Sequence, residues 1–186
     1  MRWFVCWIVS ICFLLPLSAF AAKIIPKTLE HHSYRVIKVI DGDTIKLDNG
    51  QLVRLIGIDA PETKQGPKFD RDLKKRQISK SKELAMGRRS WQYAKSLLEG
   101  KKVHMELDRQ TYDDYHRLLA YVYLTNGIFV NKEIIKKGFA YPYAIKPNIK
   151  YAKIFDELYE EARQEHQGLW QEQKKASKAV RWFHDH

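Results

Sequence analysis

Apolar and polar positions alternate along the first third of the chain in the way that half-buried strands require. Residues 34–40 are rich in valine and isoleucine, and residues 43–47 and 51–58 continue the alternation. Asp41-Gly42 and Asp48-Asn49-Gly50 separate these runs with residues that favour tight turns. The pattern therefore predicts three antiparallel strands joined as a meander.

The strand pattern ends at Pro61, because proline cannot donate a hydrogen bond to a sheet. Residues 63–82 are polar and basic without a regular period, and they predict a long loop. Apolar residues then recur at helical spacing up to Gly100, which suits a helix C-terminus. Further along, the pattern predicts strands over 102–107 and 118–124, a short helix over 131–137, and a final amphipathic helix that carries Phe155, Leu158, Tyr159 and Ala162, with Trp170 folding back onto the core.

Five short strands with a helix between the third and the fourth follow the order of an oligonucleotide-binding (OB) barrel. The predicted fold class is α+β with a mainly β core, namely a five-stranded OB-fold barrel with three helices. Such barrels commonly bind nucleic acids or oligosaccharides on one side. The predicted organisation is a signal peptide (1–21), a linker (22–33), the barrel domain (34–170) and a basic C-terminal tail (171–186).

The N-terminus has the features of a secretory signal. Arg2 supplies a positive start, residues 3–20 are mostly apolar, and Ala19-Phe20-Ala21 has the small-x-small form of a cleavage site. The apolar run is of marginal length for a membrane span, so an uncleaved anchor is the alternative. Pro16 and the Ala-x-Ala end favour cleavage after residue 21 and export to the periplasm or the medium.

Cysteine and charge content narrow the chemistry. Both cysteines, Cys6 and Cys12, lie in the predicted signal, so the mature chain is expected to carry neither a disulfide nor a thiol nucleophile. The formal net charge of +11 attracts polyanions such as nucleic acid, anionic lipid or acidic polysaccharide. No feature predicts an oligomer or a stable protein partner, so we expect a monomer, and a membrane contact only if the signal is uncleaved.

Three carboxylates stand where a barrel alone does not require them. Asp43 opens the second predicted strand, Asp59 follows the third, and Glu62 comes one short turn later. Each alone has an ordinary explanation as a turn or strand-end residue. Together, carboxylates with a backbone carbonyl and waters form the ligand set of a hard cation such as calcium or magnesium.

Two arginines accompany these carboxylates. Arg54 lies in the middle of the third predicted strand, where a charge is costly unless it is paired or faces a polar pocket. Arg117 starts a later strand. A guanidinium gives phosphate two parallel hydrogen bonds and keeps its charge at any working pH. The pair points to a phosphate ligand, with a solvated position on the barrel face as the alternative interpretation for Arg54.

The segments Asp41-Gly42-Asp43-Thr44, Arg54 to Glu62 and Asp113 to Tyr123 closely resemble the staphylococcal nuclease (thermonuclease) family. The resemblance extends from about Tyr34 to Trp170, and the spacing of Asp-Gly-Asp-Thr and Asp-Ala-Pro-Glu-Thr is highly specific. It implies an OB-type barrel with helices, in agreement with the predicted strand order. It also implies a metal-dependent nuclease that cuts DNA and RNA with little sequence specificity and leaves 3′-phosphates.

The resemblance implies a role for each matching acidic residue. Asp43 and Asp59 would ligate calcium, with the backbone carbonyl of Ala60 as a further ligand and magnesium as the alternative ion. Asp41 would lie near the metal without being a primary ligand. Glu62 would act through water, either as the general base for the attacking water or as the group that positions it.

The resemblance also assigns the substrate contacts, and its substrates are DNA and RNA. Arg54 and Arg117 would bind the scissile phosphate and stabilise the charge that grows on it. Tyr115 and Tyr143 match residues of the nucleotide pocket. Tyr141 is a competing match for the second of these tyrosines.

The chain departs from the family pattern in three places. The usual Tyr-Gly-Arg is here Tyr115-His116-Arg117, and histidine tolerates a positive φ less readily than glycine. Asp114 stands where a basic residue is often found. The basic segment 63–82 is longer than compact members need, and contact with a polyanionic substrate and a solvated mobile loop explain it equally well.

Two other functional classes fit parts of the sequence. A catalytically silent OB module would bind nucleic acid without cutting it, but such a protein is expected to lose the carboxylates or the arginines. All five of Asp43, Arg54, Asp59, Glu62 and Arg117 are present. A basic envelope protein that binds anionic lipid or polysaccharide would need none of them. The sequence therefore predicts an exported, calcium-dependent nuclease.

Overall fold

The computed structural model describes residues 33–171, and these contain a closed five-stranded barrel. Its strands are β1 (Tyr34–Val39), β2 (Thr44–Leu47), β3 (Leu52–Leu55), β5 (Lys102–Glu106) and β6 (Leu118–Leu124). They follow one another around the barrel in the order β1-β2-β3-β6-β5, and β5 pairs with β1 to close it. β1, β2 and β3 form the predicted antiparallel meander, whereas β3 and β6 run parallel.

The third predicted strand, residues 51–58, is divided in the structure. β3 ends at Leu55, and β4 (Gly57–Asp59) leaves the barrel to pair with β7 (Tyr141–Tyr143). Gly57 turns the chain with a φ of 78°, and a Cβ atom there would come within 2.5 Å of the Phe155 ring. Glycine is required because other residues rarely adopt that φ and would also clash. The division creates a short arm that carries Asp59 away from the barrel wall.

Among the described residues there are four α-helices, one more than predicted. They are α1 (Pro67–Arg76), α2 (Lys80–Leu98), α3 (Val130–Lys136) and α4 (Ala152–Gln164), followed by the 3₁₀ helix η2 (Gly168–Trp170). The prediction of a loop over 63–82 was wrong because α1 and the start of α2 fill most of it. α1 buries only Phe69 and Asp72, so it lacks the apolar period that reveals a helix.

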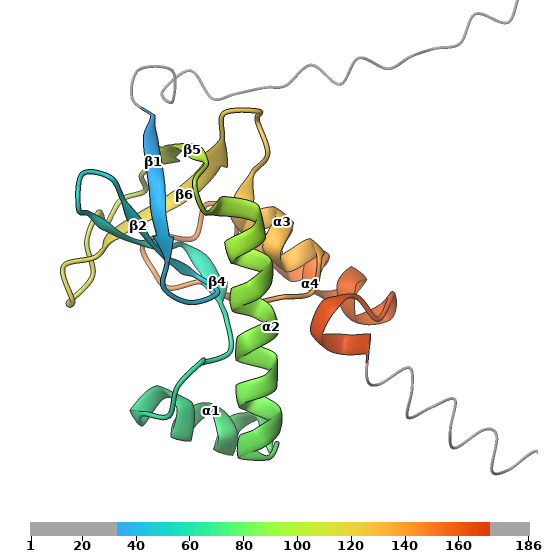
Figure 1. Cartoon of the computed structure of the whole chain (residues 1–186). Coiled ribbons are helices and arrows are strands. Elements are labelled where there is room, and N and C mark those ends of the chain that lie inside the picture. Colours follow the sequence, from blue (N-terminus) through green and yellow to red (C-terminus); the bar gives the residue numbers. More distant parts are fainter. Residues whose placement is uncertain (1–32, 172–186) are drawn as a thin grey trace, which may run out of the picture.

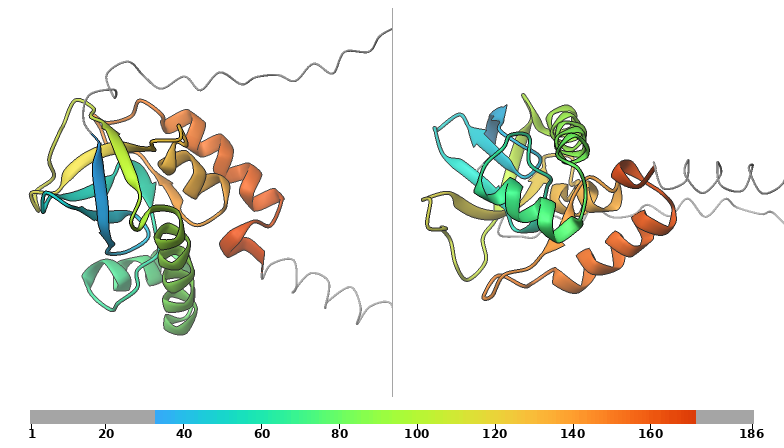
Figure 2. Two further views of the ribbon diagram at one scale, coloured as in Figure 1. Left: turned by 45° about the horizontal axis from the view of Figure 1, so that its top comes forward. Right: turned by 90° about the horizontal axis from the view of Figure 1, so that it is seen from below.

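The helices arrange themselves around the barrel in two groups. α2 stands against the barrel and extends beyond it, and α1 crosses the far end of α2 (Figure 1). α3 and α4 pack on each other at another side of the barrel, as the two further views show (Figure 2). α1 therefore lies beside one end of the barrel, next to the β4 arm.

Aromatic residues join the barrel to the C-terminal helices. Tyr121 of β6 packs edge-on against Tyr151 at 4.6 Å between ring centroids. Trp170 is buried, and its ring stands edge-on to Tyr141 and Tyr159 at 5.4 Å and 5.6 Å. These contacts confirm the prediction that Trp170 folds back onto the core, and they fix β7 beside the arm that carries Asp59.

The predicted signal peptide, most of the linker and the tail beyond residue 171 lie outside the described residues. Their assignment stays a prediction from the sequence. Across residues 33–171, no helix combines the length and the apolar content that a bilayer span needs.

Candidate active site

Asp43 is held at the start of β2 by neighbouring segments. Its backbone carbonyl accepts a hydrogen bond from the Leu55 amide at 2.9 Å, and its amide donates to Asp41 Oδ1 at 3.0 Å. Its carboxylate accepts from the Ala60 amide at 2.7 Å and from the Thr44 hydroxyl at 3.1 Å. The side chain is buried, so its position is set by the fold before any ligand binds.

Arg54 bridges the two central aspartates. The register of β2 and β3 sets Arg54 opposite Thr44, which brings its side chain beside Asp43. One guanidinium nitrogen lies 3.1 Å from Asp43 Oδ1, and the other lies 3.3 Å from Asp59 Oδ1. Its side chain is only 12% exposed, which excludes the interpretation of Arg54 as a solvated residue on the barrel face. A buried charge of this kind needs its partners.

The β4 arm places Asp59 and Glu62 beside the same cavity. Asp59 ends β4, opposite Tyr141 of β7. Further along the chain the backbone of Glu62 packs against α2, where a Cβ atom on Gly87 would lie 2.1 Å from the Glu62 carbonyl oxygen. The Glu62 amide also donates to the buried Glu83 carboxylate at 3.4 Å. α2 therefore helps to fix the position of the Glu62 backbone relative to the cavity.

Arg117 reaches the cavity from the loop before β6. Asp113 organises this loop by accepting hydrogen bonds from the amides of Tyr115 and Arg117 at 3.0 Å and 2.9 Å. The Arg117 guanidinium lies 2.7 Å from Asp113 Oδ2 and 3.5 Å from the Thr44 hydroxyl. His116 has a φ of 57°, so the position where the family resemblance expects glycine does adopt the left-handed conformation.

The predicted site residues other than Ala60 line one open cavity of about 590 Å³. This volume lies within the roughly 300–1,000 Å³ of ligand sites. Tyr143 and the highly exposed Tyr115 also line it. Tyr141 lies under the Arg76 guanidinium instead, 4.1 Å from its ring centroid, so the geometry favours Tyr143 as the match. The lining includes Asp41, Asp43, Arg54, Asp59, Glu62 and Arg117.

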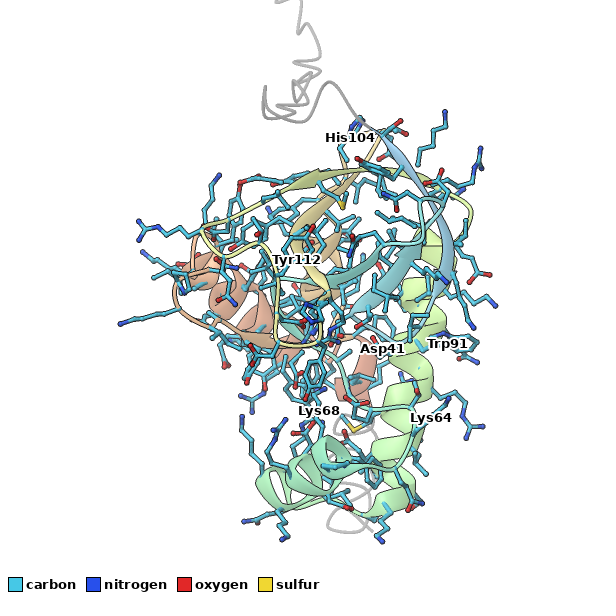
Figure 3. The ribbon with its side chains drawn as sticks, turned by 90° about the vertical axis from the view of Figure 1, so that its left-hand side faces the viewer. Asp41, Lys64, Lys68, Trp91, His104 and Tyr112 are labelled. Atoms are coloured by element: carbon cyan, nitrogen blue, oxygen red, sulfur yellow. The ribbon has the colours of Figure 1, made fainter. Side chains whose placement is uncertain are left out.

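Two cations from α1, which the sequence did not single out, also enter the site. Lys68 Nζ lies 2.9 Å from Asp59 Oδ1, and it donates to Glu62 Oε1 at 2.5 Å and to the Ala60 carbonyl at 3.3 Å. Arg76 lies 3.4 Å from the second carboxylate oxygen of Asp59. Figure 3 shows Lys68 between α1 and the barrel, on the side of Asp41, with His104 at the opposite end.

A buried ion network anchors α1. Arg76 lies 2.5 Å from Glu83 Oε1 and 3.5 Å from Asp72 Oδ2, and Glu83 is fully buried. Because Glu83 belongs to α2, this network ties the two helices together through Arg76, which also contacts Asp59. Pro67 is a sequence signal for the start of this helix, since proline suits a first helical position.

Burial and neighbouring charges shift the pKa values of Asp41, Asp43 and Lys68. Burial and the neighbouring Asp43 raise the pKa of Asp41 to about 7. Burial also disfavours the charge on Asp43, but Arg54 and Lys68 hold the pKa of Asp43 below its ordinary value. Burial disfavours the charge of Lys68 too, yet Asp43 and Asp59 raise the pKa of Lys68 above its ordinary value. Asp43 and Lys68 are therefore both charged at neutral pH.

Comparison of the sequence with known proteins identifies a family. Residues 52–172 match the model of the staphylococcal nuclease homologue family. A thermonuclease of Staphylococcus hyicus is 33% identical over 141 residues, covering 74% of this chain and 75% of the relative. The chain belongs to the staphylococcal nuclease family. A thermonuclease of Staphylococcus intermedius is 34% identical over 75% of this chain and 76% of its own length. The endonuclease YhcR of Bacillus subtilis (strain 168) is 33% identical over 74% of this chain but only 11% of its own length.

The site of this staphylococcal nuclease homologue suits a hard cation. Oxygens of Asp59, Ala60 and Glu62 converge on the Lys68 ammonium, so a positive charge is stable at this point. Within residues 33–171, no three Asp, Glu, His or Cys side chains form a ligand group. An ion would rely on Asp43, Asp59, the Ala60 carbonyl and water. An all-oxygen set of this kind fits calcium or magnesium better than softer metals.

Proposed function

We propose that this chain is an exported, calcium-dependent nuclease that hydrolyses phosphodiester bonds of DNA and RNA with little sequence specificity and leaves 3′-phosphates. The observation that carries the proposal is the convergence of Arg54, Asp43, Asp59, Glu62 and Arg117 on one cavity. Magnesium is the alternative ion. The chemistry of the residues and membership of the family support the same reaction.

The two arginines suit a phosphate that approaches from the open side of the cavity. Arg54 is fixed by Asp43 and Asp59, whereas Arg117 reaches the cavity from the loop before β6. Two guanidiniums in fixed positions stabilise the extra negative charge that develops as water adds to phosphorus. Contacts to phosphate rather than to bases explain low sequence specificity.

Glu62 is the group that handles the attacking water. Its side chain is about one-quarter exposed at the cavity, so it can accept the proton of a water that adds to phosphorus. The P–O5′ bond then breaks, the leaving oxygen takes up a proton, and the phosphate stays on the 3′ oxygen. When bound by Asp43, Asp59 and the Ala60 carbonyl, a divalent cation would neutralise charge on a phosphate oxygen.

A catalytically silent module that only binds nucleic acid is the alternative. It accounts for the basic charge and the barrel, but it does not require carboxylates held against arginines at a cost in desolvation. The same objection applies to an envelope protein that binds anionic lipid or polysaccharide.

A cleavage assay tests the proposal. Single-stranded DNA and RNA are incubated with the purified protein in calcium, in magnesium and in chelator, and the product ends are analysed. Cleavage with calcium that stops in chelator and yields 3′-phosphates is expected. Glu62→Gln should abolish most turnover, whereas the exposed Glu157→Gln on α4 serves as the matched control. Absence of cleavage in every condition contradicts a nuclease, and cleavage in chelator contradicts the metal requirement.

Export has its own test. The apolar segment before Ala21 and the Ala-x-Ala end support removal of the signal. Expression in a bacterial host, separation of periplasm, medium and membranes, and sequencing of the N-terminus should give a soluble protein that begins at Ala22. Recovery of the full chain in the membrane fraction would instead indicate an uncleaved anchor.

A further inference from the structure

Lys68 fills the point where the acidic groups of the site converge. Its ammonium has three N–H donors, and three oxygens lie within reach, from Asp59 at 2.9 Å, Glu62 at 2.5 Å and Ala60 at 3.3 Å. The side chain is 33% exposed. A lysine that only cross-linked α1 to the barrel would need one of these contacts.

The same oxygens include two of the ligands proposed for the metal. Calcium binds oxygen at about 2.3–2.6 Å, so an ion held by Asp59 and the Ala60 carbonyl would lie close to the present position of the Lys68 ammonium. Two positive charges at such a distance repel each other strongly in a partly desolvated site. The ammonium and the metal therefore compete for Asp59 and Ala60.

α1 keeps the ammonium in place. Lys68 is the second residue of the helix, which Pro67 begins, and Arg76 ends the same helix at the other carboxylate oxygen of Asp59. Arg76 is locked by the buried Glu83 of α2. The helix thus presents two cations to Asp59 from a fixed base.

We propose that Lys68 is an internal counterion that occupies the metal-binding oxygens of the metal-free protein and thereby sets the affinity of the site for a divalent cation. The inference rests on the proposed metal site. Metal binding requires Lys68 to leave Asp59 and Ala60, and the freed ammonium then stays on α1 beside the cavity that receives the phosphate. Lys68 is a positioning residue for Glu62 in the metal-free state.

Calcium titration of the metal-free protein by calorimetry tests this role. Lys68→Met keeps most of the length of the side chain and removes the charge, and it should tighten calcium binding at least about tenfold, equivalent to about 1.4 kcal/mol. Arg71→Met is the matched control, because Arg71 lies on the same helix and lines the same cavity, but its side chain is exposed and its ion pair is with Asp72, at 3.8 Å, instead of with Asp59 or Glu62. It should change the affinity by less than about twofold, since exposed charges are screened.

Thermal unfolding supplies a second readout with the opposite sign. Without metal, Lys68→Met should lower the melting temperature because Asp59 and Glu62 each lose a counterion, and calcium should raise it more than in the wild type. Lys68→Gln is the second variant if the methionine form does not fold. A purely structural lysine would lower the melting temperature without tightening calcium binding.

The outcomes separate this inference from the proposed function. Calcium binding by the wild type and the variant with equal affinity, or weaker binding by the folded variant, overturns the role of Lys68 and leaves the proposed nuclease intact. Absence of calcium and magnesium binding by both proteins overturns the metal requirement and this inference together.

Discussion

The charged residues around Asp59 come from two sides of the site, and the two sides hold their residues in different ways. On the barrel side, formed by Asp43 and Arg54 of the barrel and Asp59 of the neighbouring β4 arm, backbone hydrogen bonds and strand register fix each position, as in the hydrogen bond from the Leu55 amide to the Asp43 carbonyl. On the helix side, formed by Lys68 and Arg76, long side chains reach the same aspartate through ion pairs alone.

The backbone of the fold fixes the residues on the barrel side, whereas ion pairs of the side chains hold the residues on the helix side. A position fixed by strand register cannot move without breaking strand pairing, whereas a long side chain can release its partner by rotation about its own bonds. The barrel side is therefore suited to hold the reacting groups, and the helix side to adjust the charge around them.

Loss of Arg76 should have the largest effect, and it acts on stability. Arg76→Met leaves Glu83, whose side chain is fully buried, without its counterion. Removal of one partner from a buried ion pair costs about 3–5 kcal/mol. Urea unfolding measures the loss, and the neighbouring exposed Lys75→Met is the control.

A double variant sharpens this result. Adding Glu83→Gln to Arg76→Met removes the unpaired charge, so part of the lost stability should return. An Arg76→Met protein with the urea midpoint of the wild type would mean that the helix side contributes nothing to the fold.

Loss of Arg117 should have the next largest effect, and it acts on turnover. Arg117→Ala should lower kcat on the order of 10²-fold or more, because one donor to the transition state is lost. Stability should change little, since the Asp113 partner is partly exposed and can be solvated. Steady-state kinetics on single-stranded DNA measures the effect, with the exposed Arg109→Ala as the control. Near-normal turnover of Arg117→Ala would mean that the site has been rebuilt around His116.

The barrel side could be predicted from the sequence because its residues lie within short, patterned segments. Turn signals and alternation located the strands, and Asp43, Arg54 and Asp59 stand at their ends or within them. The division of the third strand at Gly57 was missed, because alternation continues through the break while φ does not appear in a sequence.

The helix side could not be predicted, because its signals are electrostatic and long-range. α1 has almost no apolar face, and Glu83 and Arg76 explain each other only after folding brings them together. Eight lysines and arginines between residues 63 and 82 suggested an outward-facing basic loop. In the structure, two of those cations, Lys68 and Arg76, turn inward and pair with Asp59.

Gly87 lies where α2 packs against the backbone of Pro61 and Glu62, and changing it should have an intermediate effect. In Gly87→Ala the new Cβ atom would meet the backbone of Glu62, which cannot move as a side chain does. We expect a loss of about 1–3 kcal/mol in stability and a fall in kcat larger than any rise in KM, because Glu62 is displaced. Urea unfolding and steady-state kinetics test both, with the exposed Arg88→Ala as the control. Wild-type values for both would show that α2 does not set the position of Glu62.

His116 should give the smallest effect, and it tests how tightly the loop before β6 holds Arg117. A left-handed φ costs a residue with a side chain about 1–2 kcal/mol, while glycine loses about 0.5–1 kcal/mol through the entropy of the unfolded chain. His116→Gly should therefore stabilise the protein by up to about 1.5 kcal/mol. Its turnover should stay within about twofold of the wild type, because His116 does not line the cavity.

His116→Ala separates the backbone from the imidazole, since alanine removes the ring and keeps the strained φ. The glycine variant should be the more stable of the two in urea unfolding. Equal stability of both would place the cost in the ring instead. A large change in kcat for the glycine variant would mean that the left-handed turn, and not only Asp113, aims Arg117 at the phosphate. In that case the position of Arg117 would depend on backbone strain as well as on its ion pair with Asp113.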